Sequence, residues 1–495
     1  MSSGGMLAAL GSIDTAVVLV YFVVIVVMGL ALSGKQGTTE EYFLGRRGMH
    51  WLIVGISIQA SVMSTISYLS MPGEQIRNGM GYIASQLGML PAILVINFLL
   101  LPYFMRMRIT TVYELFEHRF DLSVRMVSAL IFMLLRLIWM GLIVYTASYA
   151  LAEITGWWLP GVIVGVAMVG TIYTWLGGMR AVVWTDVVQW FVLFGGSLFC
   201  IGWVMVQTST GPIQWWQAAT AIEHEPQPIF AWDPRVRITV FGMIASTFFA
   251  KICLHGSDQV VVQRYLSTPS ARAAGGSFLA YVAAGVVLTA VMAVLGLALS
   301  SYAQYGPQGT GWSGPSEPDK IFPWFIANAL PVGVRGLVVA GLLAAAMSSI
   351  DSGINSVAAV VTIDFYQRFF GQEGEERSAL WVAKVVTLLS GALAVGMAFL
   401  IQLIEGNLFE IMNKSFGAFP GTLGMIMLAA ITLPRCGPRV VLVAAAVSTI
   451  CGWLVTFSAE LFGEPWGISF MWITPTACMS GLLVAAVLSL ILPRR

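Results

Sequence analysis

The sequence contains little charge. Asp, Glu, Lys and Arg make up 10% of its 495 residues, whereas soluble globular domains carry about 25% charged residues. The net charge of +1 creates no field that would attract nucleic acid or an acidic partner. Apolar residues account for 58% of the chain, and the mean hydropathy is +0.84. Because a water-soluble core cannot absorb that much apolar surface, we predict an integral membrane protein and exclude a soluble enzyme or a nucleic-acid binder.

Cysteine and histidine are also scarce. The five cysteines form no CxxC or CxxH pair, so we interpret them as free thiols packed as small hydrophobic residues. The four histidines are scattered along the chain, which argues against a histidine metal site. The sequence has no glycine-rich phosphate-binding loop, and this argues against ATP-driven transport by the chain alone.

Long apolar runs dominate the chain. A membrane-spanning helix needs about 20 mostly apolar residues, and irregular backbone cannot face lipid. We therefore predict an all-α membrane protein with about thirteen transmembrane helices. The first run is longer than a signal-peptide core, so we expect it to be retained. The predicted spans lie near residues 13–34, 50–73, 80–105, 124–153, 157–176, 181–207, 236–257, 275–302, 334–365, 379–403, 407–433, 438–462 and 470–492.

The distribution of Lys and Arg indicates the orientation in the membrane. With the N-terminus outside, most of the 25 Lys and Arg residues fall in inner loops or at inner helix ends, among them Arg125 and Arg264. The outer positions are Arg77, Arg235, Arg237, Lys320 and Arg335. The positive-inside rule therefore predicts a multi-pass protein of the inner or plasma membrane with its N-terminus outside and its C-terminus in the cytoplasm.

The run at 50–73 is unusually polar for a helix that faces lipid. Seven of the fifteen residues from Ile56 to Ser70 are polar, and Pro72 and Gly73 follow. This pattern is typical of a helix that unwinds near the membrane midplane and exposes its carbonyl groups to a cavity. The alternative is a tightly packed helix whose serine hydroxyls bond to their own backbone carbonyls.

The run at 334–365 contains a second polar segment. Ser348, Asp351 and Ser352 are spaced by three and four residues, so they share one face of a helix. Hydroxyl and carboxylate oxygens on one face suit a hard cation that prefers oxygen ligands. The alternative is a polar seam that joins neighbouring helices.

Three isolated charged residues lie in other apolar runs. Asp186 is either an interfacial acid or a cation ligand or proton carrier. Arg136 and Lys251 lie too far from the helix ends for easy snorkelling. Arg136 and Lys251 are each either a structural partner of Asp186 or Asp351, or a residue that faces a solute.

Several motifs, in the same order, resemble the sodium:solute symporter family. Residues 173–189 read YTWLGGMRAVVWTDVVQ, which is similar to the signature of that family. Residues 259–266 read QVVVQRYL and are similar to the turn after its sixth core helix. Residues 330–337 (LPVGVRGL) and 344–349 (AAAMSS) resemble the approach to its eighth core helix. The resemblance extends from about residue 13 to 435.

The resemblance implies a LeuT-like fold in a single transmembrane domain, residues 1–495. Two five-helix repeats of opposite topology would occupy residues 48–207 and 236–433, and the first helix of each repeat would be discontinuous. One additional helix (13–34) would precede the repeats, and two helices (438–492) would follow them. The count of spans from hydropathy agrees with this arrangement.

The same resemblance implies two sodium sites. In the main site, backbone carbonyls and hydroxyls would bind Na⁺, from Ala60, Met63, Ala345, Ser348 and Ser349. A second site, as in bacterial sialic acid members, would use Asp186, Ser348, Asp351 and Ser352. Those members have Ser at the position of Asp351, and two carboxylates around one cation would bind it tightly or share a proton. Sodium is therefore the only cofactor expected.

The implied substrate site resembles that of bacterial sialic acid and monocarboxylate members. Its residues would be Ser64, Ser67, Gln86, Arg136 and Lys251. Val62 departs from this pattern, because the sialic acid members have Thr there. Sugar-transporting members have Asn at the position of Lys251 and an aromatic gate at Leu254. Neither is present here, which disfavours glucose or galactose.

These features predict a sodium-coupled secondary active symporter that imports a small organic solute by alternating access. We expect an anion: sialic acid, another sugar acid or a monocarboxylate. A neutral-sugar symporter is the first alternative, and a transporter-like membrane sensor or a channel is a weaker one. The expected partners are the solute, sodium ions and the lipid bilayer. We expect no nucleic-acid partner, no catalytic residue and no enzymatic reaction, and a monomer as the functional unit.

Overall fold

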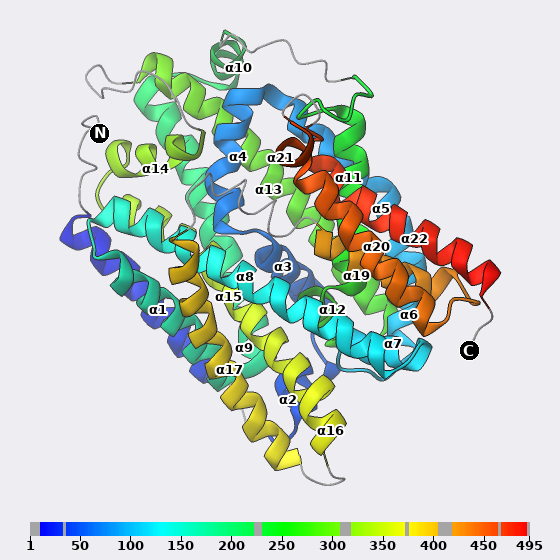
Figure 1. Ribbon diagram of the computed structural model, residues 1–495. Helices are drawn as coiled ribbons and strands as arrows, with labels where there is room; N and C mark the ends of the chain where they lie inside the picture. Colours follow the sequence, from blue (N-terminus) through cyan, green and yellow to red (C-terminus); the bar gives the residue numbers. More distant parts are fainter. Residues whose placement is uncertain are drawn as a thin grey trace.

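The computed structural model describes residues 10–32, 36–221, 230–306, 318–371, 376–403, 418–463 and 467–492. Within these ranges every regular element is a helix, and no strand occurs (Figure 1). The prediction of an all-α protein is therefore confirmed.

The helices pack into one bundle, with α1 on one side and α20 and α22 on the opposite side (Figure 1). Their bounds, in chain order, are α1 (Ser12–Leu32), α2 (Thr39–Leu44), η1 (Gly45–Arg47), α3 (Trp51–Val62), α4 (Thr65–Asn78), η2 (Gly79–Gly88), α5 (Met89–Val95), η3 (Ile96–Leu100), α6 (Leu101–Met105), α7 (Val112–Arg119), α8 (Leu122–Thr155), α9 (Leu159–Thr208), α10 (Pro212–Thr220), α11 (Val240–Ser257), α12 (Gln259–Leu266), α13 (Ala271–Tyr305), α14 (Pro318–Ala329), α15 (Val334–Val360), η4 (Val361–Gln367), α16 (Arg368–Phe370), α17 (Glu376–Ile401), α19 (Ala418–Thr432), α20 (Pro438–Thr456), α21 (Ser458–Phe462), η6 (Phe470–Trp472) and α22 (Ile473–Ile491).

The described part of the chain contains fewer separate spans than the thirteen predicted runs. Ten helices are long and apolar enough to cross a membrane, or eleven if the bent pair α3 and α4 is one span. The 50 residues of α9, at a rise of about 1.5 Å each, exceed twice the thickness of a hydrocarbon core. This helix therefore covers the two predicted runs 157–176 and 181–207. The run 407–433 is described only from Ala418 onwards, as the shorter apolar helix α19.

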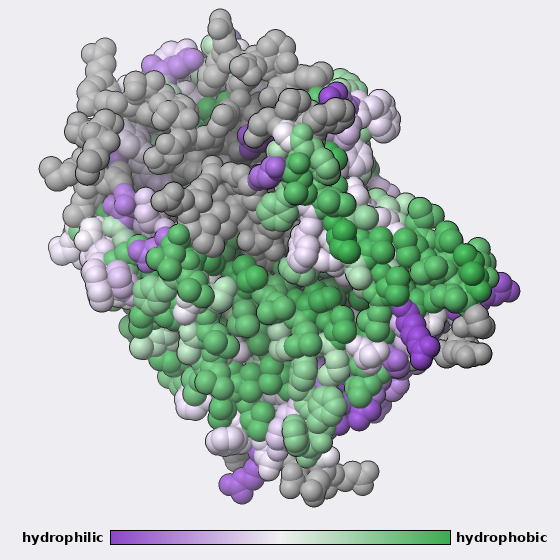
Figure 2. All heavy atoms as spheres, in the orientation of Figure 1, coloured by the Kyte–Doolittle hydropathy of each residue, from purple (hydrophilic) through white to green (hydrophobic). Residues whose placement is uncertain are grey.

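Burial distinguishes the central helix from the peripheral ones. In the most apolar stretch of the span Val334–Phe370, which begins with α15, 94% of the residues are buried, against 22% for α1. The outer faces of the peripheral helices carry exposed Leu, Val, Ile and Phe side chains. Figure 2 shows a broad apolar surface on this side of the molecule, with polar residues towards its edges. An apolar surface of this kind can face lipid. The buried polar residues gather instead around α15, at the centre of the bundle.

The run 50–73 forms two helices rather than one. α3 ends at Val62, α4 begins at Thr65, and the two are bent by 70° relative to each other. Met63, between them, has an extended backbone (φ −79°, ψ 102°), although its N–H still donates to the Gln59 carbonyl at 3.0 Å. The break leaves carbonyl groups at the end of α3 without partners in their own helix. The prediction of an unwound helix is confirmed.

A second break separates α11 from α12. Asp258 has an extended backbone (φ −84°, ψ 117°), and its Oδ1 accepts a hydrogen bond from the Val260 N–H at 2.9 Å. The carboxylate thereby satisfies one of the free N–H groups at the start of α12. The break therefore lies one residue beyond the predicted run 236–257, and α12 continues the chain after it.

Gly178 interrupts the long helix α9. Its backbone (φ +55°, ψ −156°) lies in a region that favours glycine. A Cβ atom at this position would lie 2.6 Å from the Tyr42 carbonyl oxygen of α2. Both the backbone conformation and the close approach of α2 therefore require glycine here. The interruption separates the two predicted spans, and both halves of α9 contribute residues to the site.

Candidate functional site

The broken end of α3 faces the middle of α15. The Ser348 hydroxyl donates to the Ala60 carbonyl at 2.9 Å, and the Ser349 hydroxyl donates to the Ser61 carbonyl at 3.1 Å. Both hydroxyls also lie 3.3 Å from the Ala345 carbonyl of their own helix. Neutral oxygens from two helices thus gather within hydrogen-bond distance of one another, which is a donor set suited to a hard monovalent cation.

This gathering includes four of the five residues predicted for the main sodium site. Ala60, Ala345, Ser348 and Ser349 meet through the contacts above, and Met63 lies buried at the break itself. Among the described residues, no three His, Cys, Asp or Glu side chains form a group that would hold a metal ion. Carbonyl and hydroxyl oxygens are therefore the donors that this region offers.

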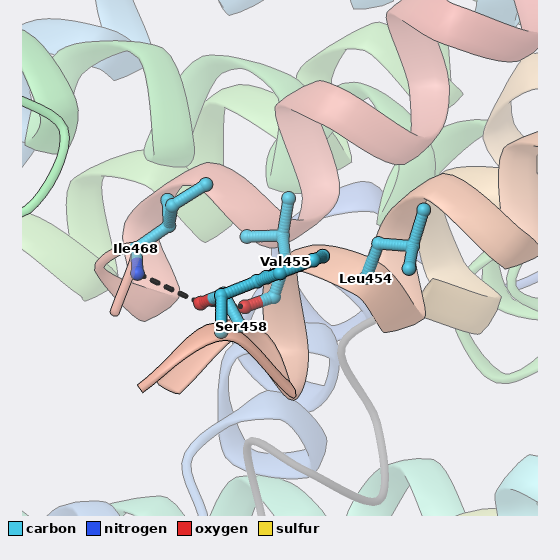
Figure 3. A pocket seen from close by; sticks show the side chains of 5 residues that line it. Leu454, Val455, Ser458 and Ile468 are labelled. Atoms are coloured by element: carbon cyan, nitrogen blue, oxygen red, sulfur yellow. Dashed lines mark hydrogen bonds between the residues drawn. The ribbon is translucent and has the colours of Figure 1, made fainter. Parts of the chain in front are cut away.

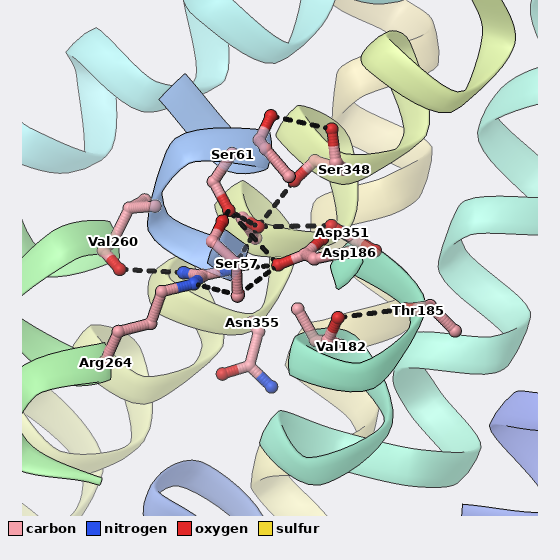
Figure 4. Close-up of polar contacts among 12 residues, drawn as sticks. Ser57, Ser61, Val182, Thr185, Asp186, Val260, Arg264, Ser348, Asp351 and Asn355 are labelled. Carbon is pink, nitrogen blue, oxygen red and sulfur yellow. Dashed lines mark hydrogen bonds and ion pairs between the residues drawn. The ribbon is translucent and has the colours of Figure 1, made fainter. Parts of the chain in front are cut away.

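A buried polar cluster lies directly beside this contact and is centred on Arg264 of α12 (Figure 4). The Arg264 side chain is completely buried, and all three of its nitrogen atoms donate hydrogen bonds. Nε donates to Ser57 at 2.9 Å, Nη1 donates to the Val260 carbonyl at 2.8 Å, and Nη2 donates to Asp186 at 2.9 Å. Nη2 also contacts the Ser352 hydroxyl. We call this group the Arg264 cluster; its members are Ser57, Ser61, Tyr173, Asp186, Arg264, Asp351 and Ser352.

Two carboxylates belong to the Arg264 cluster. Asp186 accepts hydrogen bonds from Ser57 at 2.5 Å and from Ser61 at 3.2 Å, in addition to the Arg264 ion pair. Asp351 is held by hydroxyl groups instead, because Tyr173 donates to its Oδ2 and Ser352 lies 3.2 Å from its Oδ1. Both carboxylates are fully buried. Asp186 Oδ1 has no hydrogen-bond partner among the described residues, and it is therefore an acceptor left open in the cluster.

The structure brings the residues of the predicted second sodium site together. Asp186, Ser348, Asp351 and Ser352 all lie in or next to the Arg264 cluster. Asp186 is completely buried inside the cluster. The sequence placed Arg264 in an inner loop or at an inner helix end. Arg264 lies in the last turn of α12, and its contacts with α3 and α9 could not be read from local composition.

A cavity of about 250 Å³ borders the broken end of α3. Its charged lining groups among the described residues are Arg136 of α8 and Asp258 at the α11–α12 break, which form an ion pair with each other. Ser61 and Val62 of α3 line the same cavity, so the carbonyls near Ala60 lie one residue away from it. The remaining lining is mostly apolar, as in other small-molecule sites. We call this cavity the Arg136 cavity; its other lining residues are Leu135, Trp139, Ala250, Cys253, Leu254, Ser257, Val260, Val261, Pro420, Leu423 and Thr474.

The predicted substrate residues are only partly brought together. Arg136 lines the cavity, whereas the Ser64 and Ser67 hydroxyls lie 3.3 Å from each other at the start of α4. Gln86 is half-buried in η2. Lys251 donates to the Tyr281 hydroxyl at 2.6 Å. The four residues other than Arg136 are not among the cavity's lining residues.

The sequence-based alternative, in which Arg136 and Lys251 are structural charges, named the wrong partners for them. We considered pairing with Asp186 or Asp351, but Arg136 pairs with Asp258 and Lys251 with Tyr281. Sequence reasoning missed Asp258 as a site residue. The sequence feature that could have identified it is an acidic residue directly after the apolar run 236–257 and directly before the QVVVQRYL segment.

A second cavity, of about 370 Å³, lies near the C-terminal helices α20 and α21 (Figure 3). Among the described residues its lining is apolar apart from Ser458, whose hydroxyl already accepts a hydrogen bond from the Ile468 N–H at 2.7 Å.

Comparisons with known proteins place these features in a family. The chain matches the model of the sodium:solute symporter family over residues 42–447. It is 26% identical over 460 residues to the sodium/sialic acid symporter of Proteus mirabilis, covering 91% of each chain. It is 30% identical over 403 residues to the sodium-coupled monocarboxylate transporter 1 of Xenopus laevis, covering 79% of this chain and 62% of that one.

A solved structure shows the same architecture. The structure of a Na⁺-coupled sialic acid symporter, substrate-bound and outward-open, superimposes with a TM-score of 0.86 at 26% identity. The alignment covers 98% of this chain and 99% of that one. The fold is thus the LeuT-like inverted-repeat fold of sodium symporters, as predicted. The match to the family model spans most of the chain, and the described polar site lies inside it. This protein belongs to the sodium:solute symporter family.

Proposed function

We propose that this protein imports a small organic anion together with Na⁺ by alternating access. The observation that carries the proposal is the position of the Arg136 cavity next to the broken end of α3. A cationic side chain lies in that cavity, and the carbonyl and hydroxyl oxygens of Ala60 and Ser348 lie beside it. An anion in the cavity and a cation at the break would attract each other across a few residues of low-dielectric protein.

Na⁺ would bind at the main site through Ala60, Met63, Ala345, Ser348 and Ser349. The hydroxyls that now donate to carbonyls would rotate, so that their oxygens face the cation. Because Ser61 and Val62 line the cavity, bound Na⁺ would raise the affinity for an anion there, and the anion would raise the affinity for Na⁺ equally. A membrane potential of about 100 mV adds about 2.3 kcal/mol for each charge that crosses.

The second cation site is proposed at Asp186, Ser348, Asp351 and Ser352. Two ionised carboxylates and one guanidinium leave the Arg264 cluster with one excess negative charge, and a single bound Na⁺ would neutralise it. The open acceptor Asp186 Oδ1 supports this assignment. The related sialic acid symporter structure is described as revealing a novel Na⁺ site, which also supports it.

We propose that the solute is sialic acid, another sugar acid or a monocarboxylate. Arg136 would bind the carboxylate, because a guanidinium matches the geometry of a carboxylate. Ser64, Ser67, Gln86 and Lys251 are proposed to contact the remainder of the solute once it is bound. The names of the relatives, a sialic acid symporter and a monocarboxylate transporter, support an anion over a neutral sugar.

The membrane arrangement follows from the sequence prediction. We propose that the protein lies in the inner or plasma membrane with its N-terminus outside, that it works as a monomer, and that it does not change the solute chemically. The repeats are proposed at residues 48–207 and 236–433. α3 and α4 belong to the first repeat and α11 and α12 to the second, so each repeat contributes one broken helix to the site.

Uptake into proteoliposomes tests the proposal. We expect accumulation of glucuronate, lactate or N-acetylneuraminate that needs an inward Na⁺ gradient, and little uptake of glucose. Equal uptake of glucose would favour the neutral-sugar alternative. Binding without gradient-driven accumulation would favour a sensor, and gradient-independent equilibration would favour a channel.

A further inference from the structure

Arg136 and Asp258 form a buried ion pair inside the cavity in which the solute is proposed to bind. Arg136 is 8% exposed and Asp258 is 9% exposed, and both line the Arg136 cavity. They come from different parts of the fold, because Arg136 lies in the middle of α8 and Asp258 at the break between α11 and α12. A solute carboxylate that approaches Arg136 must therefore compete with a carboxylate that is already present.

The guanidinium of Arg136 is only partly used by this pair. Nη2 bonds to Asp258, but Nε is buried and has no hydrogen-bond partner among the described residues. The Phe132 ring lies 5.7 Å from the guanidinium carbon and covers one side of it. An unpartnered buried N–H is costly. A carboxylate that bonds both Nε and Nη2 would satisfy this donor, but it needs the position that Asp258 now occupies.

Asp258 can release Arg136 without losing all of its partners. Its Oδ1 accepts the Val260 N–H at 2.9 Å and thereby caps the N-terminus of α12, while Oδ2 contacts Arg136. After release, the carboxylate would remain at the positive end of this helix, where a negative charge is stabilised. The exchange of one carboxylate for another on Arg136 therefore keeps both charges compensated.

We propose that Asp258 is a resident substitute for the anionic group of the solute and that solute binding displaces it from Arg136. This inference rests on the proposed function and adds a residue that determines specificity. A neutral sugar offers no charge to replace Asp258, so the pair excludes it. An anion brings one extra negative charge into the cavity, and Na⁺ at the neighbouring main site compensates this charge. The displacement should therefore depend on Na⁺.

The test compares Asp258→Asn with wild-type protein in detergent. Asp121→Asn is the matched control, because Asp121 also caps a helix N-terminus, through the Val124 N–H at 3.0 Å, but it does not line the cavity. Binding of glucuronate, lactate and N-acetylneuraminate is measured with and without Na⁺, with glucose as the neutral counterpart of glucuronate. Thermal midpoints are recorded for each combination.

We expect Asp258→Asn to bind the acid about tenfold more tightly in Na⁺, because the competing carboxylate is gone. Without solute its thermal midpoint should fall below that of wild type, because Arg136 is left without a counter-charge. Saturating acid should restore the midpoint. Asp121→Asn should change neither the acid affinity nor the size of the acid-dependent shift.

Two outcomes would overturn the exchange. Weaker acid binding by Asp258→Asn would mean that Asp258 contacts the bound solute directly, and unchanged affinity would mean that the pair does not compete with it. If Asp258→Asn fails to fold, Asp258→Ser retains a capping hydroxyl and replaces it in the test. Absence of Na⁺-dependent binding of any acid by wild type would refute the proposed function itself. If only the proposed carboxylate exchange is wrong, the wild-type protein still binds the acid in the presence of Na⁺.

Discussion

Two buried arginines form ion pairs at opposite ends of α12 and differ in how completely they are hydrogen-bonded. Arg264, in the last turn of α12, is fully buried and uses all three guanidinium nitrogens. Arg136, which contacts Asp258 at the other end of α12, borders a cavity and leaves Nε without a partner among the described residues. Complete bonding holds Arg264 in place, whereas incomplete bonding next to a cavity leaves Arg136 available to a ligand.

The short helix α12 connects the two ion pairs physically. Asp258 caps its N-terminus and Arg264 lies near its C-terminus, so both ion pairs are attached to one helix of eight residues. The Gln263 amide also bonds to Asn355 of α15 and to the Phe43 carbonyl, at 2.8 Å each. Release of Asp258 by Arg136 would therefore act on the cluster that contains Asp186. A connection of this kind is one physical route for coupling between a solute and a cation.

The largest expected effect is the loss of Arg264. Arg264→Ala leaves Asp186 buried without its cation, which should cost about 3–5 kcal/mol of stability. We expect a large drop in the thermal midpoint or no folded protein, and only partial recovery in Arg264→Lys, because one ammonium nitrogen cannot take the places of the three guanidinium nitrogens that reach separate acceptors. Arg439→Ala, at an exposed position, is the control. A stable Arg264→Ala protein would remove the contrast between the two arginines.

Arg136→Ala should act on the solute more than on the fold. Loss of the guanidinium should weaken binding of the acid by about 2–5 kcal/mol, which is about 30-fold or more. Na⁺ binding should persist, because the oxygens around Ser348 are untouched. Solute-dependent and Na⁺-dependent currents are measured on the same protein. Retained acid affinity in Arg136→Ala would make Arg136 as structural as Arg264.

The sodium contact should depend on both serines of α15. Ser348→Ala with Ser349→Ala removes two hydroxyl ligands from a site with few ligands, and we expect an apparent Na⁺ affinity at least about tenfold lower, or about 1.4 kcal/mol. Ser356→Ala is the matched control, because Ser356 is buried on the same helix and its hydroxyl has no hydrogen-bond partner among the described residues. Normal Na⁺ dependence of uptake in the double variant would contradict the site.

The smallest effect is expected outside the membrane spans. Arg368 and Arg125 donate to Glu117 of α7 and lower the pKa of its carboxyl below the ordinary value. This contribution to stability is present at neutral pH and is lost as the pH falls through the lowered pKa. Glu117→Gln should remove this pH dependence and cost under about 1 kcal/mol near neutral pH, because the group is partly exposed. Thermal midpoints of both proteins across pH check this, and equal pH profiles would contradict it.

Much of the fold was predictable, because hydrophobicity and helical periodicity are local properties. The apolar runs located the spans, and the polar residues between Ile56 and Ser70 predicted a break, which the structure places between Val62 and Thr65. The spacing of Ser348, Asp351 and Ser352 correctly placed three side chains on one buried face. Gly178 lies in the motif of residues 173–189, but nothing in that motif indicated that α2 packs against this glycine.

Partners across the bundle could not be predicted in the same way. Asp258 and Arg136 are 122 residues apart, and Arg264 and Asp186 are 78 residues apart. A cationic side chain inside a membrane protein needs a negative charge nearby, but the sequence offers several acidic residues that would serve equally well as its partner. Composition and periodicity by themselves determined the helices, the break in the run 50–73 and the presence of buried charges. Only the tertiary structure decided which carboxylate faces which guanidinium, because that choice depends on distances set by the packing of α12 against α3 and α15.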